Sequence, residues 1–270
     1  MPEVERHMTL VYVEPIGTGN SGRLDDPSGY TLDRYVRQVD GLIEHLGQER
    51  TYVLGHSYGG FVAQRYALLY PGRLAGLILY DTSPTTTQDF HADIGENLGR
   101  FAGRNADEPW LADTMAAWQE VSAATADPDV SDEQLTGIFH RMFPAYLADY
   151  RGRQREFAPT LAGLRVFAEP ARAEEPTPLD ARGELASITV PTLIIAGRHD
   201  AICSLRWSRL LHEGIPGSEL AVFEESGHFA HFEEPETFSW VIRGWIEASS
   251  VGAGSGSGRA EISHRANASA

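Results

Sequence analysis

One serine in this chain has the surroundings of an enzyme nucleophile. Ser57 is the centre of the pentapeptide Gly-His-Ser-Tyr-Gly, which lies between the apolar run 52–54 and the amphipathic stretch 61–70. The pattern Gly-x-Ser-x-Gly between a strand and a helix is typical of a nucleophile elbow, a tight turn that lifts the serine hydroxyl above the edge of a sheet. We expect Gly55 and Gly59 to be needed because larger side chains would crowd the neighbouring strand or helix. The pattern therefore predicts that Ser57 is a nucleophile.

A serine nucleophile needs two partners, and the chain supplies both in a suitable order. A histidine must take the hydroxyl proton, and an acid must orient the imidazole and stabilise its charged form. Asp200 follows the β-rich run 192–196, and His228 follows the β-rich run 220–223. Loops at the carboxyl edge of a parallel sheet converge on one crevice. We therefore predict a catalytic triad of Ser57, Asp200 and His228, in the order serine, acid, histidine.

Other residues near these positions leave alternatives open. Asp81 also ends a β-rich run and is an alternative acid, although its sequence Asp-Thr-Ser-Pro is equally typical of a turn. His231 lies three residues beyond His228 without a preceding glycine, so we expect it to be a neighbour in the same loop. His56 and His199 adjoin the predicted nucleophile and acid, but adjacent residues on a strand or turn point apart.

The chain alternates between strand-like and helix-like patterns, as the elements that position such a site must. β-rich runs at 9–14, 51–54 and 74–80 alternate with helical periodicity at 31–46 and 58–70. This βαβαβ series predicts an α/β fold with a mostly parallel sheet flanked by helices.

After this series the pattern changes. Residues 84–185 have no convincing strand and several helical segments, one of them opened by the capping-box residues Ser131 and Gln134. We predict that this stretch is a helical cap, and that residues 1–83 and 186–248 form the α/β core.

The last part of the chain returns to the α/β pattern and then loses it. The two β-rich runs named above are followed by helical periodicity, from about 203 to 211 and from about 235 onward. Residues 249–270 are rich in Ser, Gly and Ala and almost without large apolar side chains. Such a segment cannot offset its ordering entropy by burial, so we expect a disordered tail.

The charge balance excludes several kinds of partner. The chain has 38 acidic and 22 basic residues, a net charge of −16, and no lysine. It is unsuited to a nucleic acid or an anionic membrane, and lysine Schiff-base chemistry is excluded. No segment approaches the roughly 20 apolar residues of a membrane span, and no signal-like stretch opens the chain. We expect a soluble, cytoplasmic protein that binds a small-molecule or short-peptide substrate.

Nothing in the sequence indicates a metal or an organic cofactor. Cys203 is the only cysteine, and no histidine pair has metal-ligand spacing. The loop 17–22 is glycine-rich but lacks the third glycine of a dinucleotide fingerprint. We expect Gly17 and Gly19 of this loop, together with His56, to form the rim of the substrate pocket.

Four segments match the motifs of a known family: Tyr12–Gly22, Leu54–Gly60, Ile195–Asp200 and Gly227–Pro235. With these segments the chain resembles the α/β-hydrolase fold superfamily, and within it the proline iminopeptidase-like serine hydrolases, over roughly residues 9–248. The resemblance implies an enzyme that cleaves a small amide, peptide or ester through an acyl-enzyme intermediate. It ranks an aminopeptidase first and a carboxylesterase or lactonase second.

The resemblance also bears on parts of the chain outside the triad. The elbow supplies the backbone N–H of Tyr58 as one donor to the oxyanion. Acids in the cap, among them Glu96, Glu108 and Glu120, could bind the free amine of a substrate, although most are expected on solvated helix faces. A dehalogenase or epoxide hydrolase is disfavoured, because those enzymes need a carboxylate where Ser57 stands.

The start of the chain departs from the family pattern. Family members resemble one another in carrying, before the strand that matches 9–14, further strands and a glycine-rich turn that donates a second N–H to the oxyanion. Only eight residues precede Thr9. The missing strand would lie between 9–14 and 51–54, so these two must close up, a partner must fill the gap, or the chain is N-terminally truncated, which we favour. The alternative of another class is a non-catalytic or truncated α/β-hydrolase-like ligand-binding protein.

Overall fold

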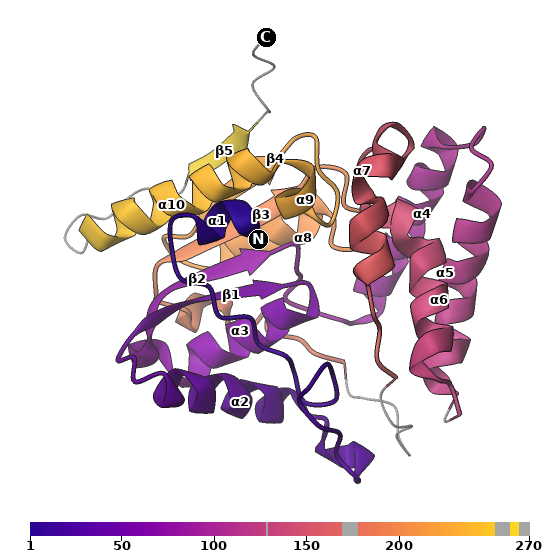
Figure 1. Cartoon of the computed structure of the whole chain (residues 1–270). Coiled ribbons are helices and arrows are strands. Elements are labelled where there is room, and N and C mark those ends of the chain that lie inside the picture. Colours follow the sequence, from indigo (N-terminus) through magenta and orange to yellow (C-terminus); the bar gives the residue numbers. More distant parts are fainter. Residues whose placement is uncertain (128, 169–177, 252–259, 265–270) are drawn as a thin grey trace.

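A parallel five-stranded sheet lies at the centre of the computed structural model, which describes residues 1–127, 129–168, 178–251 and 260–264. The strands follow one another across the sheet in chain order. They are β1 (Thr51–His56), β2 (Leu74–Tyr80), β3 (Thr192–Gly197), β4 (Glu219–Phe223) and β5 (Ala260–His264). A parallel sheet collects the carboxyl ends of its strands at one edge, and the predicted site residues follow β1, β3 and β4 there (Figure 1).

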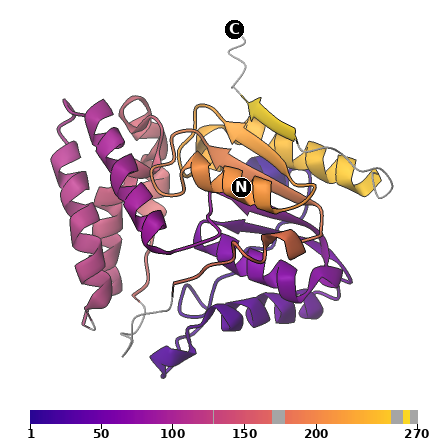
Figure 2. The ribbon, with the colours of Figure 1, turned by 180° about the vertical axis from the view of Figure 1, so that it is seen from behind.

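Helices cover both faces of the sheet, as predicted. One face carries α2 (Leu32–His45), α3 (Tyr58–Leu69) and α8 (Leu205–Gly214), and the other carries α1 (Pro2–Glu5) and α10 (Pro235–Val251) (Figures 1 and 2). Leu77 and Leu79 of β2 pack in the first layer, whereas Ile78 and Tyr80 pack in the second. A strand buried on both faces requires a continuous apolar run, which explains the sequence of β2.

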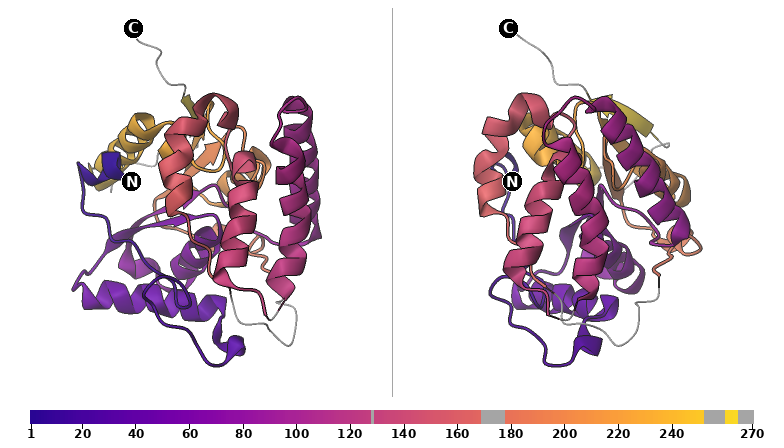
Figure 3. Two further views of the ribbon diagram at one scale, coloured as in Figure 1. Left: turned by 45° about the vertical axis from the view of Figure 1, so that its right-hand side comes forward. Right: turned by 90° about the vertical axis from the view of Figure 1, so that its right-hand side faces the viewer.

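The insertion between β2 and β3 is helical in its described part and stands beside the sheet (Figures 1 and 3). It contains α4 (Gln88–Arg104), α5 (Leu111–Ala126), α6 (Asp132–Met142), the 3-10 turn η3 (Phe143–Tyr146) and α7 (Tyr150–Gly163). The predicted capping box opens α6, with Ser131 and Gln134 each bonding the other's backbone N–H. An antiparallel bridge between Thr85 and Asp180 joins the two ends of the insertion. The two ends of the insertion therefore lie side by side where they join the core.

Short helical turns complete the described structure. They are η1 (Pro27–Gly29), η2 (Pro71–Arg73), η4 (Leu185–Ser187) and α9 (Ala230–Glu233). Within the ranges that the structure describes, no helix combines the length and the apolar character that crossing a membrane requires.

The strand predicted at 9–14 is wrong. This segment has no strand geometry, its Val11 and Tyr12 side chains are about half exposed, and β1 is the edge strand of the sheet. The side chain of Gln38 bonds the backbone on either side of Pro15, at Glu14 O and Ile16 N. β-branched and aromatic residues favour a strand only where a neighbouring ladder exists to pair with. The alternative in which 9–14 and 51–54 close up is therefore excluded.

The prediction of a disordered tail at 249–270 is wrong for two segments. Residues 249–251 continue α10, and residues 260–264 form β5, which pairs with β4 from Glu219 opposite Ala260 to Phe223 opposite His264. The prediction weighed side-chain burial alone, whereas a parallel ladder satisfies backbone groups regardless of side-chain size. The rest of the predicted tail lies outside the described residues.

Candidate active site

Ser57 lies on the tight turn that the pentapeptide predicts. It joins β1 to α3 with φ 52° and ψ −121°, a backbone conformation that a residue with a Cβ adopts only under constraint. Ser57 N–H donates to the Tyr80 carbonyl at 3.0 Å, and the Thr82 hydroxyl donates to the Ser57 carbonyl at 2.7 Å. The neighbouring strand β2 and the residues after it therefore hold the turn.

Two glycines make room for this turn, but only one of them was predicted. A Cβ at Gly55 would overlap the Gly59 carbonyl, so Gly55 is needed as expected. Gly59 itself faces open space, which contradicts its predicted steric role. A Cβ at Gly60 would instead overlap the Thr82 side chain, which holds the turn. The glycine that the packing requires is therefore Gly60, one residue after Gly59, the second glycine of the motif.

The predicted acid and base lie together at the carboxyl ends of β3 and β4. His228 Nδ1 is 2.7 Å from Asp200 Oδ2, and both side chains are buried. The other Asp200 oxygen accepts the backbone N–H groups of Ile202 and Cys203 at 2.7 and 3.0 Å. These bonds fix the direction of the carboxylate. Because Nδ1 of His228 is hydrogen-bonded to Asp200, Nε2 is the imidazole nitrogen that is available to accept a proton.

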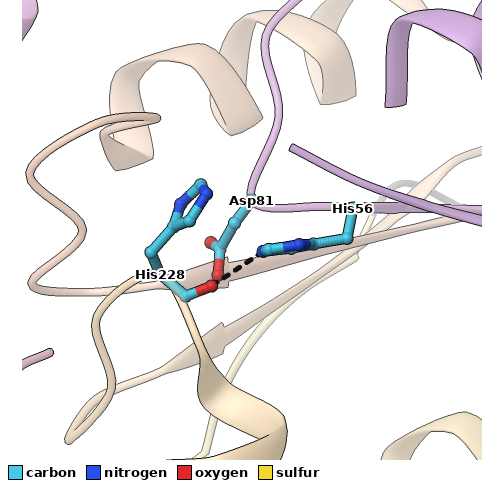
Figure 4. Close-up of side chains that lie close together, drawn as sticks. All are labelled: His56, Asp81 and His228. Atoms are coloured by element: carbon cyan, nitrogen blue, oxygen red, sulfur yellow. Dashed lines mark hydrogen bonds between the residues drawn. The ribbon is translucent and has the colours of Figure 1, made fainter. Parts of the chain in front are cut away.

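His56 connects the elbow to the base. Its Nε2 is 2.8 Å from the His228 carbonyl oxygen, and its ring centroid is 4.6 Å from that of His228. Tyr80 and Phe229 also pack against the His56 ring. Burial, and then the proximity of His228, hold the pKa of His56 well below its ordinary value. His56 thus lies against the His228 loop as a neutral hydrogen-bond donor (Figure 4), and its role at a pocket rim stays a prediction.

The Ser57 hydroxyl itself makes no hydrogen bond within the described residues. Catalytic hydrogen bonds are often long in a ligand-free site and tighten when substrate binds. Tyr58 is the first residue of α3, and the role of its backbone N–H as the oxyanion donor stays a prediction. Gly17 and Gly19 adopt positive φ values in a loop that bonds to itself and to Gln38. Their role at a pocket rim stays a prediction.

The loop that carries His228 is bonded to the cap. His228 N–H donates to the Tyr146 carbonyl at 2.6 Å. Glu233 accepts the N–H of Gly227 at 2.6 Å with one carboxylate oxygen and the N–H of Ala148 at 2.7 Å with the other. Burial raises the pKa of Glu233 to about 7, against the effect of these bonds. The sequence showed Glu233 only as part of a matching segment, because nothing local indicates what it bonds.

The alternative acid, Asp81, also lies at the site but is not the hydrogen-bond partner of His228. It has one carboxylate oxygen within 4.8 Å of ring nitrogens of His56 and His228 (Figure 4). Its Oδ1 accepts the N–H of Gly197 at 2.8 Å. The geometry therefore favours Asp200 as the acid that orients the imidazole.

The other two histidines that the sequence placed near the triad, His231 and His199, lie beside the site. His231 Nδ1 is 3.0 Å from the Tyr80 hydroxyl, and burial lowers the pKa of His231 to about 3. His199 donates its backbone N–H to the Ser226 carbonyl next to the His228 loop. Burial lowers the pKa of the His199 imidazole, so both rings favour the neutral form.

Two groups of side chains at the site have ligand atoms close enough to share a metal ion. They are His56, Asp81 and His228, and Asp200, Cys203 and His228. In the second group, burial raises the pKa of the Cys203 thiol well above its ordinary value, and His228 already bonds Asp200. A thiol that keeps its proton and an imidazole already engaged are poor metal ligands. The second group therefore suits proton transfer better than metal binding.

Known proteins are similar to this chain over most of their length. The proline iminopeptidase of Saccharolobus solfataricus is 27% identical over 252 residues, which cover 89% of this chain and 76% of that protein. The solved esterase of Thermogutta terrifontis is 25% identical with a TM-score of 0.60, covering 87% of this chain and 78% of that one. The solved proline iminopeptidase of Mycobacterium smegmatis is similar in fold, with 22% identity, a TM-score of 0.61 and coverage of 88% and 79%.

A family model described as alpha/beta hydrolase fold matches residues 1–235. This match includes the elbow, the acid and the histidine loop. The chain belongs to the alpha/beta hydrolase fold family.

Proposed function

We propose that the chain is a serine hydrolase that works through an acyl-enzyme intermediate. Ser57 Oγ attacks a carbonyl carbon, while His228 Nε2 takes the hydroxyl proton and passes it to the leaving amine or alcohol. Asp200 orients the imidazole, and the Tyr58 N–H binds the oxyanion. A water molecule, deprotonated by His228, then releases the acyl group.

The observation that carries this proposal is the buried pair of Asp200 and His228 beside a strained serine turn. A 2.7 Å bond between a carboxylate and an imidazole, both removed from solvent, selects one tautomer and one ring orientation. His56, the residue before Ser57, bonds the His228 carbonyl, so the base and the nucleophile turn are joined through one side chain.

Labelling with a fluorophosphonate probe tests the proposal, because the probe reacts with activated serines. We expect label on the peptide that contains Ser57, and none in Ser57→Ala. Ser122→Ala, an exposed serine on the cap helix α5, is the matched control and should label like the wild type. A well-folded wild-type protein that takes no label would favour the non-catalytic ligand-binding alternative and overturn the serine hydrolase.

The proposed substrate class is a small amide or peptide, with an ester or lactone second. The proline iminopeptidase relative supports the first, and the esterase structure supports the second. Three cap acids that could hold a substrate's amine instead form ion pairs: Glu96 with Arg100, Glu108 with Arg151, and Glu120 with Arg141.

Parallel assays on proline p-nitroanilide and on short p-nitrophenyl esters separate the two classes. We expect turnover of both substrates. Hydrolysis of the anilide should depend on the free amino group of the substrate's proline. Turnover of the esters alone would overturn the aminopeptidase and leave a carboxylesterase. Ser57→Ala is the background control in both assays.

A further inference from the structure

Asp81 combines features that rarely meet in one residue. Its side chain is fully buried at 0% exposure, and its backbone has φ 42°, in the left-handed region that disfavours residues with a Cβ. Its Oδ2 atom has no hydrogen-bond donor within the described residues. Backbone strain and unsatisfied buried polar atoms persist where the surroundings enforce them, and both occur preferentially at functional sites.

The surroundings of Asp81 provide few donors for a second negative charge. Oδ1 accepts a single backbone N–H, from Gly197. Asp200 is held beside Asp81, because its backbone N–H donates to the carbonyl of the same Gly197 at 3.4 Å. The other ionisable groups near Asp81 are His56 and His228, with ring nitrogens within 4.8 Å of one of its carboxylate oxygens, and Tyr80, Cys203 and Glu233, whose charges act on the same region.

Two neighbouring buried carboxyl groups do not both ionise, because like charges repel strongly in a medium of low polarity. Two carboxylates are also both acceptors, so a hydrogen bond between them requires one proton. Asp200 accepts two backbone N–H groups and the His228 ring, whereas Asp81 accepts one backbone N–H. The donors thus favour the charge on Asp200 and the proton on Asp81 Oδ2. Burial, followed by the charge of Asp200, raises the pKa of Asp81 well above its ordinary value.

We propose that Asp81 is a positioning residue of the triad: a neutral carboxylic acid that donates its Oδ2 proton to the Asp200 carboxylate. The pair then carries one negative charge, directed at His228. Asp81 acts through Asp200 and touches no substrate. This role rests on the proposed function, since positioning Asp200 matters only if His228 is the base.

Infrared difference spectroscopy detects the proton without any turnover. The wild-type protein at pH 8.5 should show the C=O stretch of a protonated carboxyl group, which shifts in D2O and disappears in Asp81→Asn. The matched control is Glu233→Gln, because Glu233 is the other buried acid with a raised pKa, here to about 7. The band should survive this change. A wild-type spectrum without the band, or a band lost in Glu233→Gln and kept in Asp81→Asn, would overturn the proposal.

Kinetics test the positioning role with two substitutions of similar size. Asp81→Asn keeps a donor for Asp200 and an acceptor for Gly197 N–H, whereas Asp81→Leu keeps neither. We expect kcat of the Leu variant to fall about tenfold or more below that of the Asn variant, with KM little changed, which is the size of one hydrogen bond to a charged group. Equal kcat values in two folded variants would contradict the positioning role.

The two measurements also separate this proposal from the proposed function. If the protein takes no fluorophosphonate label while the infrared band is present, the serine hydrolase fails and the neutral carboxyl pair stands. If Ser57 labels normally and the band is absent, only the role of Asp81 fails.

Discussion

The two halves of the proposed triad are held in different ways. The half formed by Asp200 and His228 is buried in the molecule, and each residue has bonds to groups from distant parts of the chain. The half formed by Ser57 depends on one turn at the end of β1, the edge strand, and its hydroxyl has no bond within the described residues. The side chains of the base half are therefore preorganised by their hydrogen bonds, whereas β2 and Thr82 hold only the backbone of the nucleophile turn, and a bound substrate must complete the bonding of the Ser57 hydroxyl.

The largest effect should come from removing the nucleophile. Ser57→Ala should lower kcat on a p-nitrophenyl ester by about 10^4-fold or more, because residual catalysis then comes only from the oxyanion donor and from binding. His228→Ala should cost about the same, and the double variant little more, since the two groups act as a unit. Steady-state kinetics check this, with Ser122→Ala as the control. Additive losses would show that the two halves act separately.

The acid should rank next. Asp200→Asn keeps the shape but loses the charge that selects the tautomer of His228, so kcat should fall about 10^3- to 10^4-fold. Asp180→Asn, an exposed acid at the base of the cap, is the control. If Asp81→Asn caused the larger loss, the acid would have to be reassigned to Asp81.

Glu233, which bonds the loop of the base half to the cap, should make the stability of the protein depend on pH. The pKa of Glu233 is about 7 in the folded protein against an ordinary 4.5, so the folded state binds its proton more tightly than the unfolded state. The free energy of unfolding should therefore fall as the pH rises from about 4.5 to about 7, by about 3 kcal/mol, and then level off. Urea titrations at pH 5 and pH 8 measure this change.

Glu233→Gln supplies the control for that prediction. The variant cannot ionise at position 233, so its stability should lose this slope whatever its absolute value. An equal slope in the wild type and in Glu233→Gln would assign the pH dependence to another group.

The link between the halves should show a smaller effect. His56→Phe keeps a ring against Tyr80 and Phe229 but removes the donor to the His228 carbonyl. Because one hydrogen bond contributes on the order of 1 kcal/mol, kcat/KM should fall roughly five- to tenfold. His45→Phe, an exposed histidine at the end of α2, is the control. Unchanged kinetics would show that the base needs no support from the elbow.

The smallest effect should come from the segment 9–14, which precedes the nucleophile half in the sequence. Val11→Ser or Val13→Ser should change the free energy of unfolding by less than about 0.5 kcal/mol, because both side chains are exposed. Thermal melts check this. A loss of 1 kcal/mol or more would indicate that the segment is buried as a strand after all.

The elements that could be predicted from the sequence are those whose signals are local. The elbow around Ser57 and the capping box at Ser131 are fixed by neighbouring residues, and the structure contains both. The meeting of Asp200 and His228 followed from chain order together with the geometry of a parallel sheet. This reasoning needed no knowledge of how the side chains pack.

The features that escaped prediction depend on partners far away in the chain. Whether 9–14 or 260–264 forms a strand is decided by a ladder partner: β5 has one in β4, and 9–14 has none in the described residues. The roles of Glu233 and Asp81 depend on burial and on backbone donors from other loops. No spacing in the sequence encodes those contacts.

The most direct test of the central claim is to trap the acyl-enzyme. The protein is mixed with a p-nitrophenyl ester, quenched in acid within the burst phase, digested and analysed by mass spectrometry. The mechanism predicts the mass of the acyl group on the peptide that contains Ser57, absent in Ser57→Ala and strongly reduced in Asp200→Asn. Ester turnover that proceeds with no acyl group on Ser57, or with equal acylation in Asp200→Asn, would contradict it.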